Sequence, residues 1–310
     1  MIKNTEYMIY QLSEDQIEKY KKAGFIANTV LHKASKLIKP GVKYLEIAKF
    51  VDEEIKKHDA IPAFPVTIGR NEIAAHDIPM HEDQREFTDE DVIKLDVGVA
   101  VDGYVGDNAM TVDLTKNYTE LVQATRDAVH AAIKIIGPGT LISDIGKEIQ
   151  DAIKSHGYNP ITNLSGHGLA QFKVHTYPTI PNYQTGSNAK LEENMAIAIE
   201  PFATDGNGSI REIQPSGIFS LLKTKSTRSA FVKEVQTSMT KFNGLPFSRR
   251  WLDEKHGLGK VNLAIREFQL AKTIISHGPL VEKSEGMVSQ HEHSVIVKDK
   301  PIVTTLHNKF

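Results

Sequence analysis

Apolar residues recur three and four positions apart in two long stretches of the chain, a spacing typical of amphipathic helices. The first stretch begins at Ser13 and Gln16, which match a capping box, and runs toward Leu37. The second stretch runs over residues 119–136 and stops at a Gly-Pro pair. We therefore predict two long helices whose first residues are about 100 residues apart in the sequence.

An internal repeat follows the two predicted helices. Residues 40–62 and 138–160 align without a gap, at an offset of 98 residues, and are identical at eight of 23 positions. Each copy has a Pro-Gly turn, an amphipathic helical pattern and then an extended run. Because this period is too long for a solenoid, it predicts two related α/β halves that form one pseudo-symmetric domain. The cleft between the halves is the first place to expect a binding site.

A β-hairpin is predicted over residues 92–114, where apolar residues alternate with small or polar ones around a central Asp-Gly pair. If the hairpin has no bulge, Asp107 lies opposite Gly98, and Asp96 is its diagonal neighbour at roughly 7 Å. The two carboxylates then converge on one face. Gly98 and Ala100 leave room on that face, while the valines of the first strand pack on the other.

Two carboxylates in a small-residue interior repel each other and are costly to desolvate, and a bound cation removes both costs. The hairpin therefore indicates a metal site at Asp96 and Asp107. The alternative is that both residues are solvated aspartates beside a turn.

Two further acids and a histidine interrupt apolar segments later in the chain. Glu200 ends the run MAIAIE, and Glu292 lies in a late strand, so burial of either side chain requires a partner. His167 lies between two glycines, where the backbone can approach a ligand, although a lone histidine is more often structural. Strict alternation directs His291 and His293 to the face opposite Glu292, so we do not expect them to bind metal.

The composition of the chain excludes several classes of protein and of active site. With 40% apolar residues, 25% charged residues and a net charge of −2, the chain has the composition of an ordinary globular protein. It has no cysteine, which excludes disulfides, thiolate zinc sites and a cysteine nucleophile. The first residues lack the core of a signal peptide, and no apolar run is long enough for a membrane span, so a cytoplasmic protein without membrane contact is expected. There is no G-x-S-x-G, H-E-x-x-H or P-loop motif.

The order and contexts of the five predicted ligands resemble the signature of the methionine aminopeptidase and prolidase superfamily, and the match spans nearly the whole chain. The contexts are KLDVGV, GYVGDNA, SGHG, AIEPF and QHEHS, which contain Asp96, Asp107, His167, Glu200 and Glu292. The resemblance implies an α+β pita-bread fold (the creatinase/aminopeptidase fold) with two pseudo-symmetric halves. It also implies two divalent metal ions, drawn from Co, Mn, Fe or Zn.

Roles for individual residues also come from the resemblance. It implies that Asp96 holds one ion, that His167 and Glu200 hold the other, and that Asp107 and Glu292 bridge the pair. Glu200 is then also the general base. The resemblance further places His76 near the scissile amide and His175 near the substrate carbonyl, and it implies a pocket for the methionine side chain that is lined by Phe64, Val174 and Ile218.

Within this superfamily, the chain is similar to the short archaeal form of type 2 methionine aminopeptidases. Only 95 residues precede Asp96, which argues against the extra N-terminal domain of prolidases, and helical patterns lie between Glu200 and Glu292. These patterns include Ala230, Phe231, Val235, Met239 and Phe242, and then Val261, Leu263, Ile265, Phe268 and Leu270. We expect a single catalytic domain over residues 1–310, with a helical insertion subdomain at residues 212–278.

Two positions depart from the family pattern. His277 stands where type 2 relatives commonly have a pocket tyrosine, and His291 stands in place of a frequent phenylalanine. Either substitution can change the pocket shape or the metal preference without removing the chemistry.

The expected function is removal of the initiator methionine from peptides and nascent proteins that have a small second residue. The alternatives are an X-Pro aminopeptidase of the same fold and a non-catalytic binding relative. We expect a monomer.

The insertion is basic, because residues 219–277 contain eleven Lys and Arg against four Asp and Glu, a balance of +7. The hypothesis of weak docking to ribosomal RNA follows from this charge. The residues expected to reach a partner are Lys223, Lys225, Arg228, Arg249 and Arg250. The alternative is a solvated basic face that offsets the acidic body.

Overall fold

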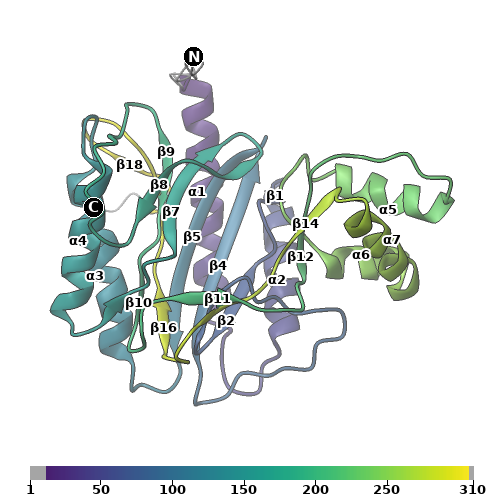
Figure 1. The fold of residues 1–310 in the computed structure, drawn as a ribbon, viewed down its shortest axis with the longest axis horizontal. Helices are drawn as coiled ribbons and strands as arrows, with labels where there is room; N and C mark the ends of the chain where they lie inside the picture. The colour runs from purple at the N-terminus through teal and green to yellow at the C-terminus, as the bar shows by residue number, and fades with distance from the viewer. Residues whose placement is uncertain (1–11, 307–310) are drawn as a thin grey trace.

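In the computed structural model, which describes residues 12–306, the helix in each copy of the 98-residue repeat forms a pair with the long helix before it (Figure 1). The first pair is α1 (Glu14–Ser35) and α2 (Tyr44–Lys57), and the second is α3 (Thr119–Ile135) and α4 (Ile142–Ser155). Helices α2 and α4 begin and end 98 residues apart. The capping box at the start of α1 is confirmed. The sequence therefore predicts the helical framework of both halves.

Each half places its helices on a β-sheet. The first sheet has the order β1-β4-β2 with β5 beside β4, and α1 packs against β4 and β5. Its strands are β1 (Ile61–Pro62), β2 (Thr67–Arg70), β4 (Val92–Val101) and β5 (Tyr104–Asp113). The second sheet has the order β18-β17-β9-β7-β8. Its strands are β7 (Ser165–Ala170), β8 (Lys173–Pro181), β9 (Ala196–Ile199), β17 (His293–Ile296) and β18 (Ile302–Val303).

Two small sheets connect distant parts of the chain. One pairs β16 with β10 and β10 with β6, and the other pairs β11 with β15 and β15 with β3. The strands of the first are β6 (Asn159–Pro160), β10 (Phe202–Thr204) and β16 (Val288–Gln290). Those of the second are β3 (Ile73–Ala75), β11 (Ile210–Glu212) and β15 (Leu280–Glu282). Both sheets bring the last third of the chain against earlier strands.

Two separate hydrophobic cores stabilise the halves. One lies between α1, α2 and the hairpin of β4 and β5, with buried side chains such as Leu31, Ile47 and Leu95. The other lies between α3, α4 and the second sheet, and includes Ile145 and Ile197. Because each helix pair covers the outer face of its sheet, the inner faces of the two sheets are left to form the site.

A helical lobe, which we define as residues 218–277, projects from one side of this body (Figure 1). Its strands are β12 (Ile218–Leu221), β13 (Phe247–Ser248) and β14 (Ile274–His277). Its helices are α5 (Ala230–Thr240), α6 (Arg249–His256) and α7 (Leu258–Leu270), and they enclose a core of their own. Leu263 and Leu270, which the helical pattern includes, are 59% and 78% exposed and lie outside this core.

The expectation that Arg249 and Arg250 reach outward to a partner is wrong. Both begin α6, and Arg250 is only 3% exposed because its guanidinium pairs with Asp52 of α2 at 2.7 Å. The indole Nε1 of Trp251 donates to the same carboxylate at 2.8 Å. Arg249 folds back on Asp253, with Nε at 3.1 Å from Oδ2. These arginines therefore stabilise the lobe and its attachment to the body.

Replacing Arg250 with Leu is expected to lower the free energy of unfolding by about 1–3 kcal/mol, because the carboxylate of Asp52 loses its buried partner. The lower part of this range reflects the partial exposure of Asp52. Thermal unfolding measures the change, and the exposed Arg228→Leu is the matched control. Equal melting temperatures for both variants would show that the pair contributes nothing.

None of the helices within residues 12–306 combines the length and the apolar character needed to cross a membrane. The first eleven residues, which bear on the expectation about a signal peptide, lie outside the described part of the chain.

Candidate metal centre and active site

The hairpin of β4 and β5 brings two aspartates together, in the register that the sequence predicts. Val101 pairs with Tyr104, and Gly98 with Asp107, without a bulge. Asp107 is 2% exposed, and its main-chain N–H donates to the Ser294 hydroxyl at 2.7 Å. Two carboxylates therefore face the interior from neighbouring strands.

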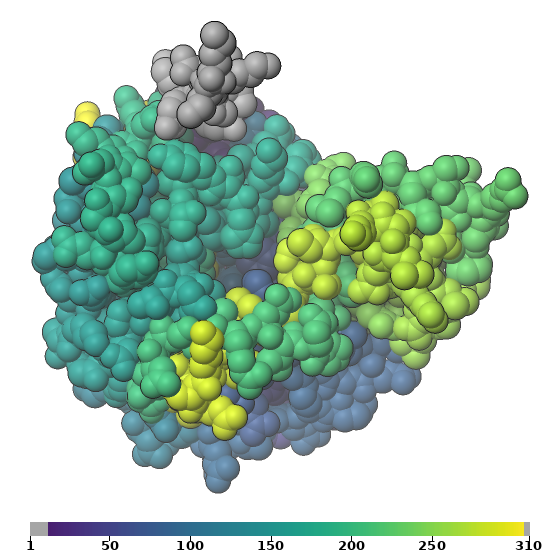
Figure 2. Space-filling model, viewed as in Figure 1, coloured from purple at the N-terminus to yellow at the C-terminus, as the bar shows by residue number. Residues whose placement is uncertain are grey.

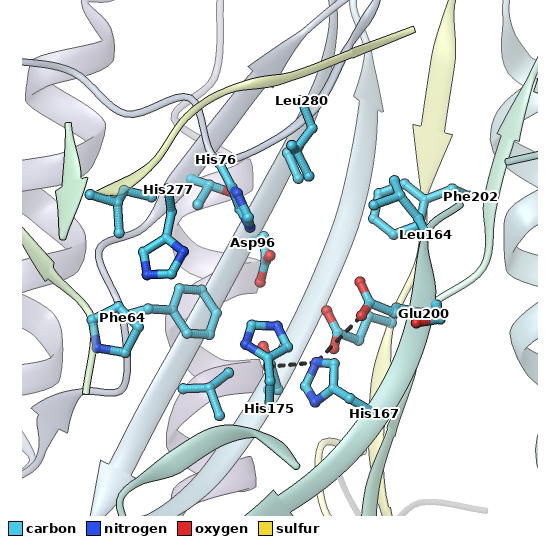
Figure 3. A pocket seen from close by; sticks show the side chains of 18 of the residues that line it. Phe64, His76, Asp96, Leu164, His167, His175, Glu200, Phe202, His277 and Leu280 are labelled. Carbon is cyan, nitrogen blue, oxygen red and sulfur yellow. Dashed lines mark ion pairs between the residues drawn. The ribbon is translucent and has the colours of Figure 1, made fainter. Parts of the chain in front are cut away.

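The remaining predicted ligands come from later in the chain, and Figure 3 shows two of them, His167 and Glu200. His167 lies in β7, Glu200 directly follows β9, and Glu292 lies between β16 and β17. The Nε2 atom of His167 is 3.3 Å from Oε1 of Glu200 and 3.9 Å from Oδ2 of Asp107. The main-chain N–H of Glu292 donates to the carbonyl of Ala109 at 3.0 Å, which joins this segment to β5.

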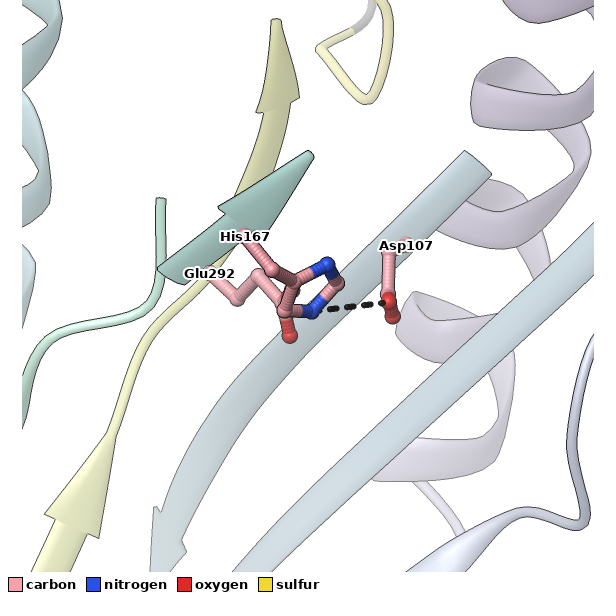
Figure 4. A group of neighbouring side chains, drawn as sticks. All are labelled: Asp107, His167 and Glu292. Carbon is pink, nitrogen blue, oxygen red and sulfur yellow. Dashed lines mark ion pairs between the residues drawn. The ribbon is translucent and has the colours of Figure 1, made fainter. Parts of the chain in front are cut away.

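Three of these side chains point toward one another in a geometry that suits a metal ion (Figure 4). One ligand atom from each of Asp107, His167 and Glu292 lies within 4.8 Å of the others, and all three residues are buried. Carboxylate and imidazole groups are common ligands of divalent transition metals.

The electrostatics of this cluster favour a cation. Burial raises the pKa of Asp96, Asp107, Glu200 and Glu292 above the usual range, and the neighbouring carboxylates raise that of Asp96, Glu200 and Glu292 further. Within residues 12–306, Asp96 Oδ1, Asp107 Oδ1 and Glu292 Oε1 are buried without a hydrogen-bond partner. A divalent cation would neutralise the repulsion and bind these oxygens, so the residues fit a metal centre.

The imidazoles of His76, His175 and His277 border the acidic cluster and its ligand His167. The rings of His167 and His175 are 4.3 Å apart between centroids, and those of His76 and His277 are 6.2 Å apart. Burial, and to a smaller extent the nearby His277 and His175, lower the pKa of His76 to about 4. Burial also lowers the pKa of His175 and His277. Neutral imidazoles can each donate one hydrogen bond and accept another.

A cavity of about 260 Å³ joins the acids and the imidazoles. All ten predicted site residues line it, including Phe64, Val174 and Ile218, and His277 is also in its wall. The space-filling view shows a hollow between the body and the helical lobe (Figure 2). The sequence did not reveal several lining residues, namely Thr67, Ala75, Asn163, Leu164, Ser165, Phe202, Pro246 and Leu280.

His291 and His293 lie away from this cavity. The Nδ1 atom of His291 is 2.9 Å from the Thr125 hydroxyl in α3, and that of His293 is 2.9 Å from the Thr305 hydroxyl. The alternation on either side of Glu292 therefore directs both rings to the opposite face, in the direction expected from the sequence.

Comparison with known proteins identifies the family. The model of metallopeptidase family M24 matches residues 18–219. The chain belongs to metallopeptidase family M24. Membership of this family implies binding of a divalent metal, in agreement with the acidic and imidazole groups of the cavity.

Archaeal proteins are similar to this M24 chain over almost its whole length. A methionine aminopeptidase from Archaeoglobus fulgidus is 42% identical over 288 residues, which cover 92% of this chain and 97% of that protein. A methionine aminopeptidase from Methanocaldococcus jannaschii is 40% identical, with coverage of 94% and 99%.

Solved structures bear on the fold. The crystal structure of a methionine aminopeptidase from Thermotoga maritima has a TM-score of 0.71 at 24% identity, and the match covers 96% of this chain and 98% of that one. The predicted α+β pita-bread fold of this M24 chain is confirmed.

Proposed function

We propose that this protein removes the N-terminal methionine from peptides and nascent proteins with a small second residue, by metal-dependent hydrolysis. The observation that carries the proposal is the cavity, which combines an apolar wall with buried carboxylate oxygens that have no hydrogen-bond partner among the described residues. The similarity to archaeal methionine aminopeptidases supports the same activity.

Two divalent ions, drawn from Co, Mn, Fe or Zn, are proposed to bind at the acidic cluster. Asp96 would hold one ion, His167 and Glu200 the other, and Asp107 and Glu292 would contact both. The distances from His167 to Glu200 and to Asp107 support this division of roles. The chemistry supplied by bound divalent ions is Lewis acidity and a water molecule of lowered pKa.

The side chains of the cavity would carry the proton transfers and orient the peptide. Glu200 is proposed as the general base, which takes a proton from the attacking water and passes it to the leaving amine. His175, beside His167, would donate a hydrogen bond to the scissile carbonyl oxygen as negative charge develops there. His76 would contact the scissile amide from the opposite side of the cavity. These roles leave the apolar wall to select the substrate.

Selection of methionine would come from Phe64, Val174 and Ile218, which are all less than 10% exposed and line the same cavity. They come from three distant parts of the chain, so the pocket exists only in the folded protein. An unbranched apolar side chain fits such a wall, and its burial supplies the binding free energy.

Cleavage of Met-Ala-Ser measured against Ala-Pro-Ala, in the presence of several divalent metals, tests the function. The proposal expects release of methionine from the first peptide and no cleavage of the second. Cleavage of Ala-Pro-Ala alone would identify an X-Pro aminopeptidase, and no cleavage of either with bound metal would favour a binding protein.

Replacing Gly98 with Ala is expected to raise KM for methionyl peptides roughly tenfold, because overpacking of a filled site costs a few kcal/mol at most. A β-carbon at residue 98 would lie 2.1 Å from the Phe64 ring, which would have to move within the cavity wall. The matched control is Gly259→Ala, since no atom of the described residues 12–306 lies within 4 Å of the added carbon there. An unchanged KM for Gly98→Ala would show that Phe64 does not line the substrate pocket.

The chain is further proposed to be one catalytic domain over residues 1–310, with residues 212–278 as an inserted subdomain. The separate core of the helical lobe supports this division.

Weak docking of the lobe to ribosomal RNA is supported by the net charge of +7 over residues 219–277 and by the exposed Lys223 and Arg228, whereas Lys225 pairs with Glu267. Charge reversal at Lys223 and Arg228 should weaken co-sedimentation with ribosomes at low salt, without affecting cleavage of a tripeptide.

A further inference from the structure

The ribbon formed by β12 and β14 begins in the wall of the cavity and continues away from it. Ile218 pairs with His277, and both residues line the cavity. The next pair on the same face is Ser220 with Ile275. The main-chain N–H of Leu222 donates to the carbonyl of Thr273 at 2.9 Å, which extends the pairing by one more step. One face of the ribbon is therefore continuous with the cavity.

The two faces of this ribbon have different surroundings. Phe219, Leu221 and Ile274 point inward and pack in or against the core of the helical lobe. The accessible part of the opposite face, which we call the outer face, is formed by Ser220, Leu222 and Ile275 beyond the cavity, whereas Thr273 opposite Leu222 is buried. Leu222 is 62% exposed and Ile275 is 46% exposed. Strands normally place polar residues on a solvated face, so two large apolar side chains here require an explanation.

We propose that the outer face binds the part of the substrate that follows the cleaved bond, as an extended peptide with apolar side chains. This inference rests on the proposed function. An aminopeptidase holds only the first residues of its substrate in the cavity, and the rest of the polypeptide has to leave it. A cavity of about 260 Å³ is below the range of about 300–1,000 Å³ that encloses a drug-sized ligand, so most of a peptide lies outside.

The dimensions of the ribbon relate each apolar residue to a position in the peptide. Two residues of a strand span about 7 Å, so Ile275 lies about 7 Å beyond His277 and Leu222 lies about 7 Å farther out. A peptide that leaves in an extended conformation covers the same distance with two residues per step. With the second residue beside His277, the fourth residue would contact Ile275 and the sixth would contact Leu222.

His277 also has a defined place in this arrangement. Its Nε2 atom is 2.9 Å from the hydroxyl of Ser220, so the first residue of the outer face orients the last imidazole of the cavity. Figure 3 shows the ring beside Phe64 and His76. The ring therefore stands where the cavity ends and the outer face begins.

The experiment compares three peptides with the metal-loaded enzyme. These are Met-Ala-Ser, a heptapeptide that continues this sequence with leucine at positions four and six, and the same heptapeptide with serine at those positions. The variants are Leu222→Ser and Ile275→Ser. Leu263→Ser is the matched control, because this leucine is 59% exposed on α7 of the same lobe and lies off the ribbon.

The proposal expects the parent enzyme to have a lower KM for the leucine heptapeptide than for the serine heptapeptide, by roughly fivefold. Each ribbon variant should lose most of this preference, while kcat and the cleavage of Met-Ala-Ser stay unchanged. The control variant should behave as the parent does.

Two results overturn the proposal, and they are distinguishable. If Met-Ala-Ser is cleaved but the heptapeptides do not differ, or if Leu263→Ser has the same effect as the ribbon variants, the outer face does not bind substrate and the proposed function stands. If no methionyl peptide is cleaved by the metal-loaded parent, the proposed function fails and this inference fails with it.

Discussion

Replacing Asp107 with Asn, or Glu292 with Gln, is expected to abolish turnover and to lower the bound metal content while the fold stays largely intact. Both carboxylates lie in the group within 4.8 Å that also contains His167. A ligand proposed to contact both ions affects the whole centre when its charge is removed. The amide variants keep the shape of the parent side chains, so the hydrophobic cores are undisturbed.

Metal content and peptide hydrolysis are measured on the same preparation, together with the melting temperature with and without added metal. Asp151→Asn is the control, since this aspartate is exposed and pairs only with Lys147 among the described residues. Metal should raise the melting temperature of the parent and the control more than that of the ligand variants, because binding to the folded state stabilises it. Full activity at normal metal content in either variant would exclude the bridging role.

Replacing His175 with Ala is expected to reduce kcat by roughly a hundredfold or more while both metals remain bound, as loss of an oxyanion donor does. The ring lies 4.3 Å from that of His167, close to the centre, and no described contact requires it as a ligand. Burial lowers its pKa, so the neutral ring can donate a hydrogen bond at neutral pH.

Metal analysis decides between the two roles that this position can have. Loss of metal as well as activity in this variant would identify His175 as a metal ligand. The control is His58→Ala, at the C-terminal end of α2 and outside the cavity. Its kcat should equal that of the parent.

The sequence predicted those parts of the fold that depend on local patterns. The Asp-Gly turn fixes the pairing of Val101 with Tyr104, and with it the positions of Asp96 and Asp107 on one face. The 98-residue repeat predicted α2 and α4, since the same apolar spacing recurs in both, and the apolar patterns before each copy predicted α1 and α3. These features need no knowledge of distant contacts.

The features that were missed depend on distant contacts. Helix α6 is short, and Arg250 at its start is buried only because Asp52 of α2 accepts its hydrogen bond. A basic residue in a sequence is ordinarily exposed, so no local pattern reveals this pair. Leu263 was included in the helical pattern of this segment, but it lies two positions from Val261 and from Ile265, which places it on another face of α7, where it is 59% exposed.

Several residues of the cavity wall could not be predicted from the sequence for the same reason. Asn163, Leu164 and Ser165 line the cavity at the start of β7, but they have neither charge nor periodicity to distinguish them. Their place follows from the pairing of β7 with β9, which brings the segment beside Glu200. His167 was found in this region only because the flanking glycines and the family resemblance marked it.

The five proposed ligands are distributed along the chain in a way that affects its synthesis. Two come from the first half, two from the second half, and Glu292 comes from the segment between β16 and β17. During translation the acidic centre therefore stays incomplete until β16 and the following residues have left the ribosome. A polypeptide that terminates before Glu292 lacks a ligand however well its first half folds. A truncated copy of this chain would therefore be inactive and could not remove methionine from other newly made proteins.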